Sequence, residues 1–121
     1  YEVDYVKFIA DGINDEVVNL SGKTTLISLA ALISKASLFI GVDSVASHIA
    51  AAVDTPSITL FGPSNVSNWR PWSDKAIVIS RTNNEEICKD HRNEPGKYKK
   101  CLCYISPSRV FNHAEEVYDS A

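Results

Sequence analysis

Apolar positions in the first 80 residues follow two alternating spacings, which predict alternating helices and strands. Val3, Val6 and Ile9 recur at helical spacing, whereas runs such as residues 37–41 are short and continuously apolar, as in buried strands. Helices are expected at 2–11, 25–35 and 45–53, and strands at Val17–Val18, 37–41, 57–62 and 76–80. Strands separated by helices of roughly ten residues need crossover connections, so an α/β fold with a parallel sheet is predicted.

The ends of the helices carry their own signals. Gly12 follows the first helix where a C-cap glycine belongs, and Thr24 or Thr25 can cap the second. Residues 81–105 are polar and contain Pro95 and Gly96, which predicts an irregular excursion. A C-terminal helix is expected over 106–120, with Ser106 as N-cap and Pro107 in its first turn.

Composition limits the class of protein. The chain has 121 residues, of which 45% are hydrophobic, and a net charge of -3, which fits one folded domain and excludes a disordered chain. An acidic balance does not favour a nucleic-acid-binding surface, and no window of 18 apolar residues predicts a membrane span. Three cysteines and no signal peptide favour a reducing compartment. The absence of methionine suggests a piece of a larger protein.

The best candidate site is the segment GVDSVASH (41–48), between a predicted strand and a helix. Ligands of open parallel sheets bind at the carboxyl ends of strands, and a helix N-terminus suits phosphate. The Asp43 carboxylate could accept sugar hydroxyl bonds and Ser44 could bind phosphate oxygen; the alternative is that both only cap the helix. His48, one turn in, is more often a packed, hydrogen-bonded residue than a catalyst.

Other segments carry weaker signals. The segment LSGKTT (20–25) resembles a phosphate-binding P-loop, but that motif requires glycine where Val17 stands, so Lys23 is either an anion ligand or a solvated side chain. Trp69 and Trp72 could stack on a base or sugar, or serve packing. A structural zinc could use Cys88, His91, Cys101 and Cys103, but the spacing matches no common zinc site, so no metal is predicted. The basic run of Lys89, Arg92, Lys97, Lys99 and Lys100 is either a solvated face or a contact with an anionic membrane.

Residues 19–64 resemble the C-terminal half of the lipopolysaccharide heptosyltransferases, glycosyltransferase family 9. That family has the motif G-x-D-[ST]-G-x-x-H-[LI]-A-A-A followed by T-P-x-x-x-L-F-G-P. The matching residues are Gly41, Asp43, Ser44, His48, Ile49, Ala50, Ala51, Ala52, Thr55, Pro56, Leu60, Phe61, Gly62 and Pro63. Residues 69–73 and 100–110 resemble the branch that adds a third core heptose, and Val45 replaces the usual glycine.

The resemblance implies a GT-B fold, in which two Rossmann-like domains face a cleft. Residues 1–121 would be a single nucleotide-sugar-binding domain, with the N-terminal acceptor domain absent. Asp43 would hold heptose hydroxyls of ADP-L-glycero-β-D-manno-heptose, with His48 nearby. Backbone N–H groups of residues 44–46 (Ser44, Val45 and Ala46) would bind its diphosphate, and Lys23, Thr24 and Thr25 would lie near adenosine. No cofactor is implied, and these residues alone would not catalyse transfer.

The implied acceptor is the lipopolysaccharide core, reached in the cytoplasm with peripheral contact to the inner membrane. Two alternatives stay open: the donor domain of another nucleotide-sugar GT-B enzyme, and a non-catalytic α/β interaction module in which Asp43 and Ser44 are only a cap.

Overall fold

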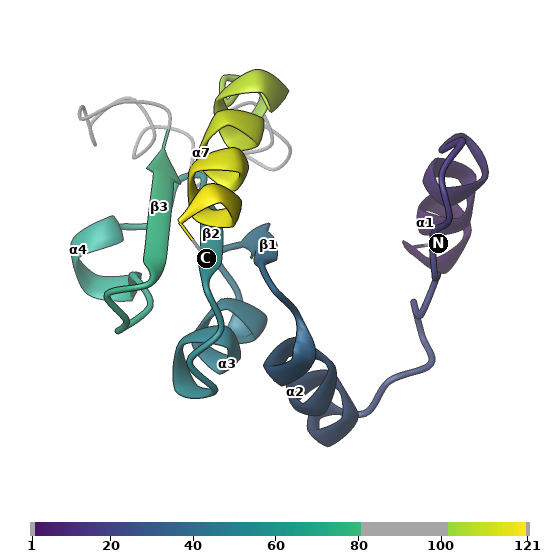
Figure 1. Cartoon of the computed structure of the whole chain (residues 1–121), viewed down its shortest axis with the longest axis horizontal. Helices are drawn as coiled ribbons and strands as arrows, with labels where there is room; N and C mark the ends of the chain where they lie inside the picture. Colours follow the sequence, from purple (N-terminus) through teal and green to yellow (C-terminus); the bar gives the residue numbers. More distant parts are fainter. Residues whose placement is uncertain (1, 81–101, 121) are drawn as a thin grey trace.

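Three parallel strands form the centre of the fold. The computed structural model describes residues 2–80 and 102–120. Strands β1 (Phe39–Val42), β2 (Ser57–Phe61) and β3 (Ala76–Ser80) lie in the order β1-β2-β3 (Figure 1). Phe39 is in register with Ser57, which is in register with Ala76. The predicted α/β class with a parallel sheet is confirmed.

Five helices accompany the sheet in the described part of the chain. They are α1 (Glu2–Asp11), α2 (Leu26–Lys35), α3 (Val45–Ala52), α4 (Val66–Trp69) and α7 (Pro107–Asp119). Thr25, not Thr24, caps α2: its hydroxyl accepts from Ser28 N–H at 3.2 Å, and Ser28 Oγ accepts from Thr25 N–H at 2.8 Å. Ser106 and Pro107 begin α7 as predicted.

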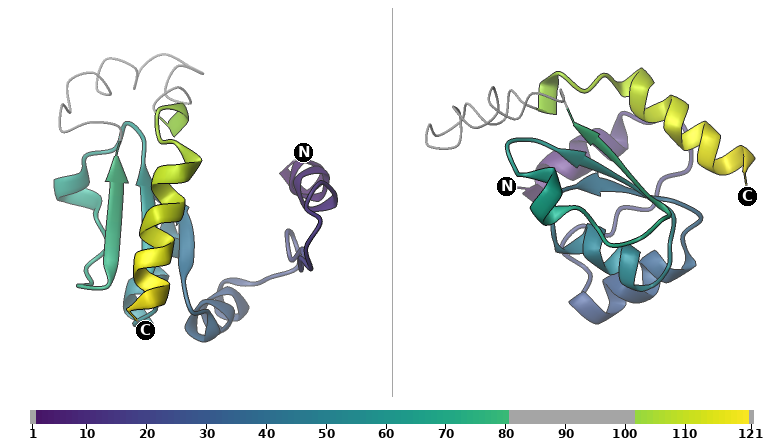
Figure 2. Two further views of the ribbon diagram at one scale, coloured as in Figure 1. Left: turned by 45° about the horizontal axis from the view of Figure 1, so that its top comes forward. Right: turned by 90° about the vertical axis from the view of Figure 1, so that its left-hand side faces the viewer.

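The sheet lies between α7 on one face and the pair α2 and α3 on the other (Figure 2). Under α7, Ile58, Ile79 and Ile105 form the buried cluster. Leu38, Leu60, Ile77, Leu102, Val110 and Ala114 pack around it. Arg109 ties the start of α7 to the end of β3, because its Nη1 donates to the Ser80 carbonyl at 2.8 Å.

On the opposite face, beside the buried ring of Phe61, the sheet carries small and polar side chains. Ser57 and Thr59 of β2 are fully buried, as are Ser47 and Ala50 of α3, which contacts both β1 and β2. Within the described residues, Ser57 Oγ and Thr59 Oγ1 have no hydrogen-bond partner. Small side chains let α3 approach the sheet closely, which fixes the position of its N-terminus at the carboxyl end of β1.

Several predicted boundaries were wrong. Val17–Val18 forms no strand, because no neighbouring strand in the described chain offers hydrogen bonds to it. The strand expected at 37–41 begins at Phe39, and helix α4 was not predicted. Most of the irregular excursion expected at 81–105 falls on residues 81–101, which lie outside the described residues. Its last residue, Ile105, is buried in the core.

Candidate functional site

Asp43 and Ser44 occupy the turn between β1 and α3. The backbone N–H of Asp43 donates to the Leu60 carbonyl at 3.1 Å, which extends the β1–β2 ladder by one residue and fixes Asp43 at the carboxyl edge of the sheet. Ser44 is the N-cap residue of α3 in extended conformation (φ -161, ψ 173). The structure therefore brings an acidic and a hydroxyl side chain together at a helix N-terminus, as predicted.

Neither side chain is used to stabilise the helix. Ser44 makes no side-chain cap bond, and in the described part of the chain the Asp43 carboxylate has no hydrogen-bond partner either. By contrast, the N-cap side chains of Thr25, Asn65 and Ser106 all accept from a backbone N–H in their helices. The alternative in which Asp43 and Ser44 are only a cap is therefore wrong for their side chains, which are left available to a ligand.

The first N–H groups of α3 complete this turn. Val45 and Ala46 stand at the first two helical positions, whose N–H groups have no carbonyl within the helix to bond. Ser47, the next residue, has no donor left for a ligand, because both its N–H (3.1 Å) and its hydroxyl (2.7 Å) donate to the Ser44 carbonyl. Two backbone donors and the positive end of the helix dipole thus lie beside Asp43 and Ser44, an arrangement that suits a phosphate group.

His48 lies one turn further along α3, and its side chain is not packed as the sequence led us to expect. Its side chain is exposed and, among the described residues, makes no hydrogen bond. A packed, hydrogen-bonded histidine was the more common interpretation of the sequence, and the structure does not support it.

The second predicted group, Lys23, Thr24 and Thr25, precedes α2. Lys23 Nζ donates to the Asn19 carbonyl at 3.3 Å, and Thr25 is the helix cap already described. Thr24 lines a cavity of about 360 Å³ between α1 and α2, together with Val6 and Leu29. Lys23 lines a second cavity beside α1, and neither cavity is lined by residues 43–48.

The two groups nevertheless share one edge of the sheet. Helix α2 runs into the amino end of β1 and packs beside α3, so both helices begin near the carboxyl edge of the strands. The structure places Lys23–Thr25 and Asp43–Ser44 at this edge without joining them in one pocket.

The loop after β2 carries the two tryptophans. Asn65 caps the short helix α4 at its Asn68 N–H, a signal in the sequence that could have revealed this helix. Trp69 is exposed, and Trp72 is 94% exposed on a loop that leads to the amino end of β3 and is anchored by buried Pro71. Trp72 lines an open cavity with Arg70, Pro71, Ser73 and Asp74, and residues 43–48 do not line that cavity.

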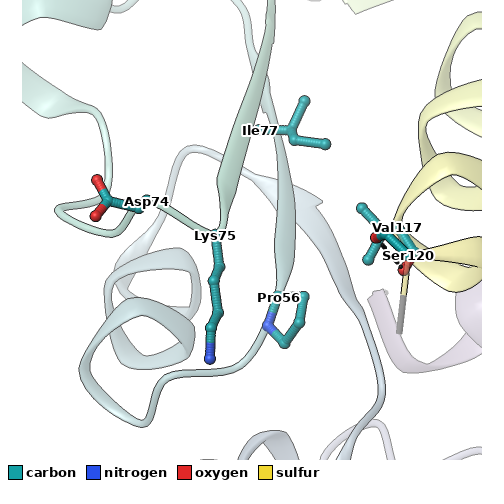
Figure 3. A pocket seen from close by; sticks show the side chains of 6 residues that line it. All are labelled: Pro56, Asp74, Lys75, Ile77, Val117 and Ser120. Atoms are coloured by element: carbon teal, nitrogen blue, oxygen red, sulfur yellow. Dashed lines mark hydrogen bonds between the residues drawn. The ribbon is translucent and has the colours of Figure 1, made fainter.

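A separate cavity of about 370 Å³ lies at the amino edge of the sheet (Figure 3). It is lined by Pro56, Asp74, Lys75, Ile77, Val117 and Ser120. The Lys75 ammonium is paired at 2.5 Å with the carboxylate of Asp54. Because Pro56 and Lys75 precede their strands, this cavity and the candidate site lie at opposite ends of the sheet.

The predictions of a zinc site and of a basic surface concern residues that lie largely outside the described part of the chain. Cys88, His91, Cys101 and the basic run of Lys89, Arg92, Lys97, Lys99 and Lys100 lie there, whereas Cys103 is described and exposed. Within residues 2–80 and 102–120, no group of three His, Cys, Asp or Glu side chains could hold a metal ion. No helix in the same ranges is long and apolar enough to cross a membrane.

Comparison with known proteins decides the family. The model of glycosyltransferase family 9 (heptosyltransferase) matches residues 1–99, which include both predicted site groups. The chain belongs to glycosyltransferase family 9. It is 42% identical over 101 residues to lipopolysaccharide heptosyltransferase 3 of Escherichia coli (strain K12), covering 84% of this chain and 29% of the relative. No solved structure matches.

Two further relatives agree. A second Escherichia coli lipopolysaccharide heptosyltransferase 3 is 53% identical over 83 residues, which are 68% of this chain and 24% of the relative. Lipooligosaccharide heptosyltransferase 2 of Haemophilus influenzae (strain ATCC 51907 / DSM 11121 / KW20 / Rd) is 36% identical over 100 residues, or 83% of this chain and 29% of the relative. This family 9 chain thus spans less than a third of the length of the curated relatives it matches.

Val45 is the point where this family 9 chain departs from the expected motif, which has glycine there. The backbone of Val45 does not have positive φ, since Asp54 is the one non-glycine residue with positive φ in the described ranges. An ordinary helical residue can therefore take this position, and the side chain of Val45 points mostly into solvent, at 60% exposure. The valine leaves the N–H donor in place and adds an apolar group beside it.

Proposed function

We propose that this chain is the donor-binding part of a heptosyltransferase that transfers heptose from ADP-L-glycero-β-D-manno-heptose to the lipopolysaccharide inner core. The observation that carries the proposal is the turn between β1 and α3 in a member of family 9, where the side chains of Asp43 and Ser44 make no hydrogen bond within the described part of the chain. The names of the relatives, lipopolysaccharide and lipooligosaccharide heptosyltransferases, support this class of reaction.

In the proposed complex, the N–H groups of Val45 and Ala46 bind the diphosphate, with the Ser44 hydroxyl beside them. The dipole of α3 stabilises the negative charge that develops on ADP as the bond to the anomeric carbon breaks. The Asp43 carboxylate accepts hydrogen bonds from heptose hydroxyls, and His48 lies on the exposed side of the same helix. Lys23, Thr24 and Thr25, at the same edge of the sheet, lie near the adenosine.

The proposal places the reaction in the cytoplasm, at the face of the inner membrane where the acceptor is held. The 121 residues supply the donor side alone, and the acceptor side comes from the remainder of a longer enzyme. The isolated chain is therefore expected to bind ADP weakly and to show no transfer of heptose. Turnover by these residues alone would contradict this division of roles.

Nucleotide selectivity tests the proposal against its alternatives. ADP is expected to raise the melting temperature of the chain, whereas UDP and GDP at equal concentration are not, because a ligand stabilises only the folded state it binds. Stabilisation by UDP or GDP instead would indicate a different donor. No stabilisation by any of the three would favour a non-catalytic module.

Asp43→Asn in the full-length enzyme tests the role of the carboxylate. A charged hydrogen bond to a hydroxyl contributes about 1.5–3 kcal/mol, so affinity or turnover for ADP-heptose should fall roughly ten- to a hundredfold, with ADP binding within a few-fold of normal. Asp74→Asn is the matched control, because it removes the same charge from an exposed residue at the opposite edge of the sheet. Equal losses for ADP and ADP-heptose would place Asp43 on the nucleotide instead.

A further inference from the structure

The loop between α4 and β3 carries Trp72, the most exposed large apolar side chain in the described ranges. We call residues 70–75 the tryptophan loop; it lies on the outer side of β3, away from α1 (Figure 1). Apolar surface stabilises a fold only when it is removed from water. The indole ring of Trp72 therefore contributes little to the stability of this chain, and its position calls for another role.

The backbone of the tryptophan loop is held on both sides of Trp72. Before it, Pro71 is fully buried, and the N–H of Arg70 donates to the first carbonyl of α4 at 2.9 Å. After it, the N–H of Ala76 donates to the Ser73 carbonyl at 3.2 Å. The exposed indole thus stands on a fixed backbone, so binding a partner here costs little backbone entropy.

Two opposite charges flank Trp72 at equal spacing along the chain. Arg70 stands two residues before it and Asp74 two residues after it, and all three residues line one open cavity of about 540 Å³. In the part of the chain that the structure describes, neither the guanidinium nor the carboxylate forms an ion pair. The neighbouring Lys75 is paired with Asp54 instead, and the Asp74 carboxylate points away from Lys75 (Figure 3). The loop therefore presents an unpaired cation, an indole ring and an unpaired anion in sequence.

This arrangement of charges is complementary to itself. In a contact about a two-fold axis, residue i of one copy faces residue j of the other, and residue j faces residue i. Since Trp72 is midway between Arg70 and Asp74, two copies of the loop that meet in opposite directions form two Arg70–Asp74 ion pairs and bring the Trp72 rings together near the axis. We infer that the tryptophan loop is an interface between two copies of this protein.

The charges of the loop favour a second copy over an anionic membrane. Arg70 and Asp74 cancel one another, and Lys75 is neutralised by Asp54, so no excess positive charge is left to attract anionic headgroups. Tryptophan and arginine are also the residues that most often dominate the binding energy between proteins. The cavity beside Trp72 has room for the partner's indole ring, because cavities of this volume hold drug-sized molecules.

The interface is expected to be small and reversible. A tryptophan buries about 150–250 Å² of surface, so two Trp72 rings with their flanking ion pairs supply less than the roughly 1,200 Å² of a standard interface. A dissociation constant of about 10–100 µM is therefore expected. The tryptophan loop precedes β3 at the amino edge of the sheet, whereas Asp43 lies at the carboxyl edge, so the dimer leaves the candidate site open and does not depend on the proposed function.

Sedimentation velocity of the full-length protein between about 1 µM and 1 mM tests the inference, since this range spans the expected dissociation constant. The mean mass should rise from that of one copy to that of two. Arg70→Asp or Asp74→Arg should raise the dissociation constant at least about tenfold, because like charges then face each other across the axis. The double variant only exchanges the charges, so it should restore the original value to within about threefold. A full-length protein that stays monomeric, or a double variant that does not recover, overturns the inference.

Trp72→Ala gives an independent readout and should also weaken the dimer at least about tenfold. Phe111→Ala is the matched control, because it removes an exposed aromatic ring from α7 and should leave the dissociation constant unchanged. All of these side chains are exposed, so the melting temperatures should change little. A monomer that binds phosphatidylglycerol vesicles through Trp72 would make the loop a membrane contact and overturn the inference. Loss of nucleotide binding in any variant would bear on the proposed function alone.

Discussion

The hydroxyl of Thr55 donates a 2.8 Å hydrogen bond to the carbonyl of Ile33, across 22 positions of sequence. Both residues are buried, and the bond joins the last turn of α2 to the segment just before β2. The bond therefore holds α2 in place beside α3, and with it the edge at which Lys23–Thr25 and Asp43 lie.

Thr55→Val is expected to lower the free energy of unfolding by about 1 kcal/mol, because the hydrogen bond is lost while the side chain stays nearly the same size. Thr24→Val is the control, since its side chain is exposed. Urea denaturation of the 121-residue chain measures both. Equal effects of the two substitutions would show that the Thr55–Ile33 bond does not contribute to the free energy of unfolding.

Ser44→Ala is expected to change the free energy of unfolding by less than about 0.5 kcal/mol, although Ser44 stands at an N-cap. The reason is that its hydroxyl makes no cap bond. Ser106→Ala, at the N-cap of α7, removes a bond to Arg109 N–H and should cost about 1 kcal/mol. Thermal denaturation compares them, and a similar loss for both would mean that Ser44 does cap α3 in solution.

Gly41→Ala is expected to destabilise the chain by about 1–3 kcal/mol, as overpacking does elsewhere. A Cβ at position 41 would lie 2.6 Å from Cζ of Phe39, so the ring would have to move. Phe39→Leu in the same chain should recover part of the loss, and a double-mutant cycle measures this coupling. Strictly additive effects would rule out contact between the two side chains.

Gly22→Ala is expected to cost about 1 kcal/mol or more, because Gly22 has a φ of +70 that L-residues rarely adopt. The added Cβ would also lie 3.2 Å from a methyl group of Val3, a residue of α1 that packs against this turn. Gly12→Ala is the matched control, since its φ is not positive and its Cβ would meet ordinary contacts. Equal melting temperatures for the two variants would contradict the strained conformation.

The sequence predicted those parts of the fold that depend on local chemistry. Ser106 and Pro107 determine the start of α7, and the apolar run that includes Phe39 identifies β1 as a strand. The expectation that this strand is buried was wrong, because Ile40 and Val42 are exposed and no residue of β1 is buried in the described structure. The position of Asp43 at a strand end also follows from the pattern alone, since the helix has to begin after it. Helical periodicity and caps are short-range, so they can be recognised without tertiary contacts.

The errors concern features that depend on neighbours. Val17–Val18 has strand character, but a strand forms only where another strand offers its backbone groups. Ser44 has the residue type of a cap, yet whether its hydroxyl turns toward the helix is a choice of rotamer that spacing does not determine. Ile105 belongs to the core because it packs with Ile58 of β2 and Ile79 of β3, and the apolar residues Leu102 and Tyr104 near it were a signal that the prediction of one polar excursion overlooked.

The contact between Arg109 and the Ser80 carbonyl joins two elements that are far apart in the sequence, strand β3 and helix α7. Ser80 is the last residue of β3, and Val110, next to Arg109, packs against the core beneath α7. Loss of the Arg109 guanidinium would therefore loosen the end of β3 and the first turn of α7 together.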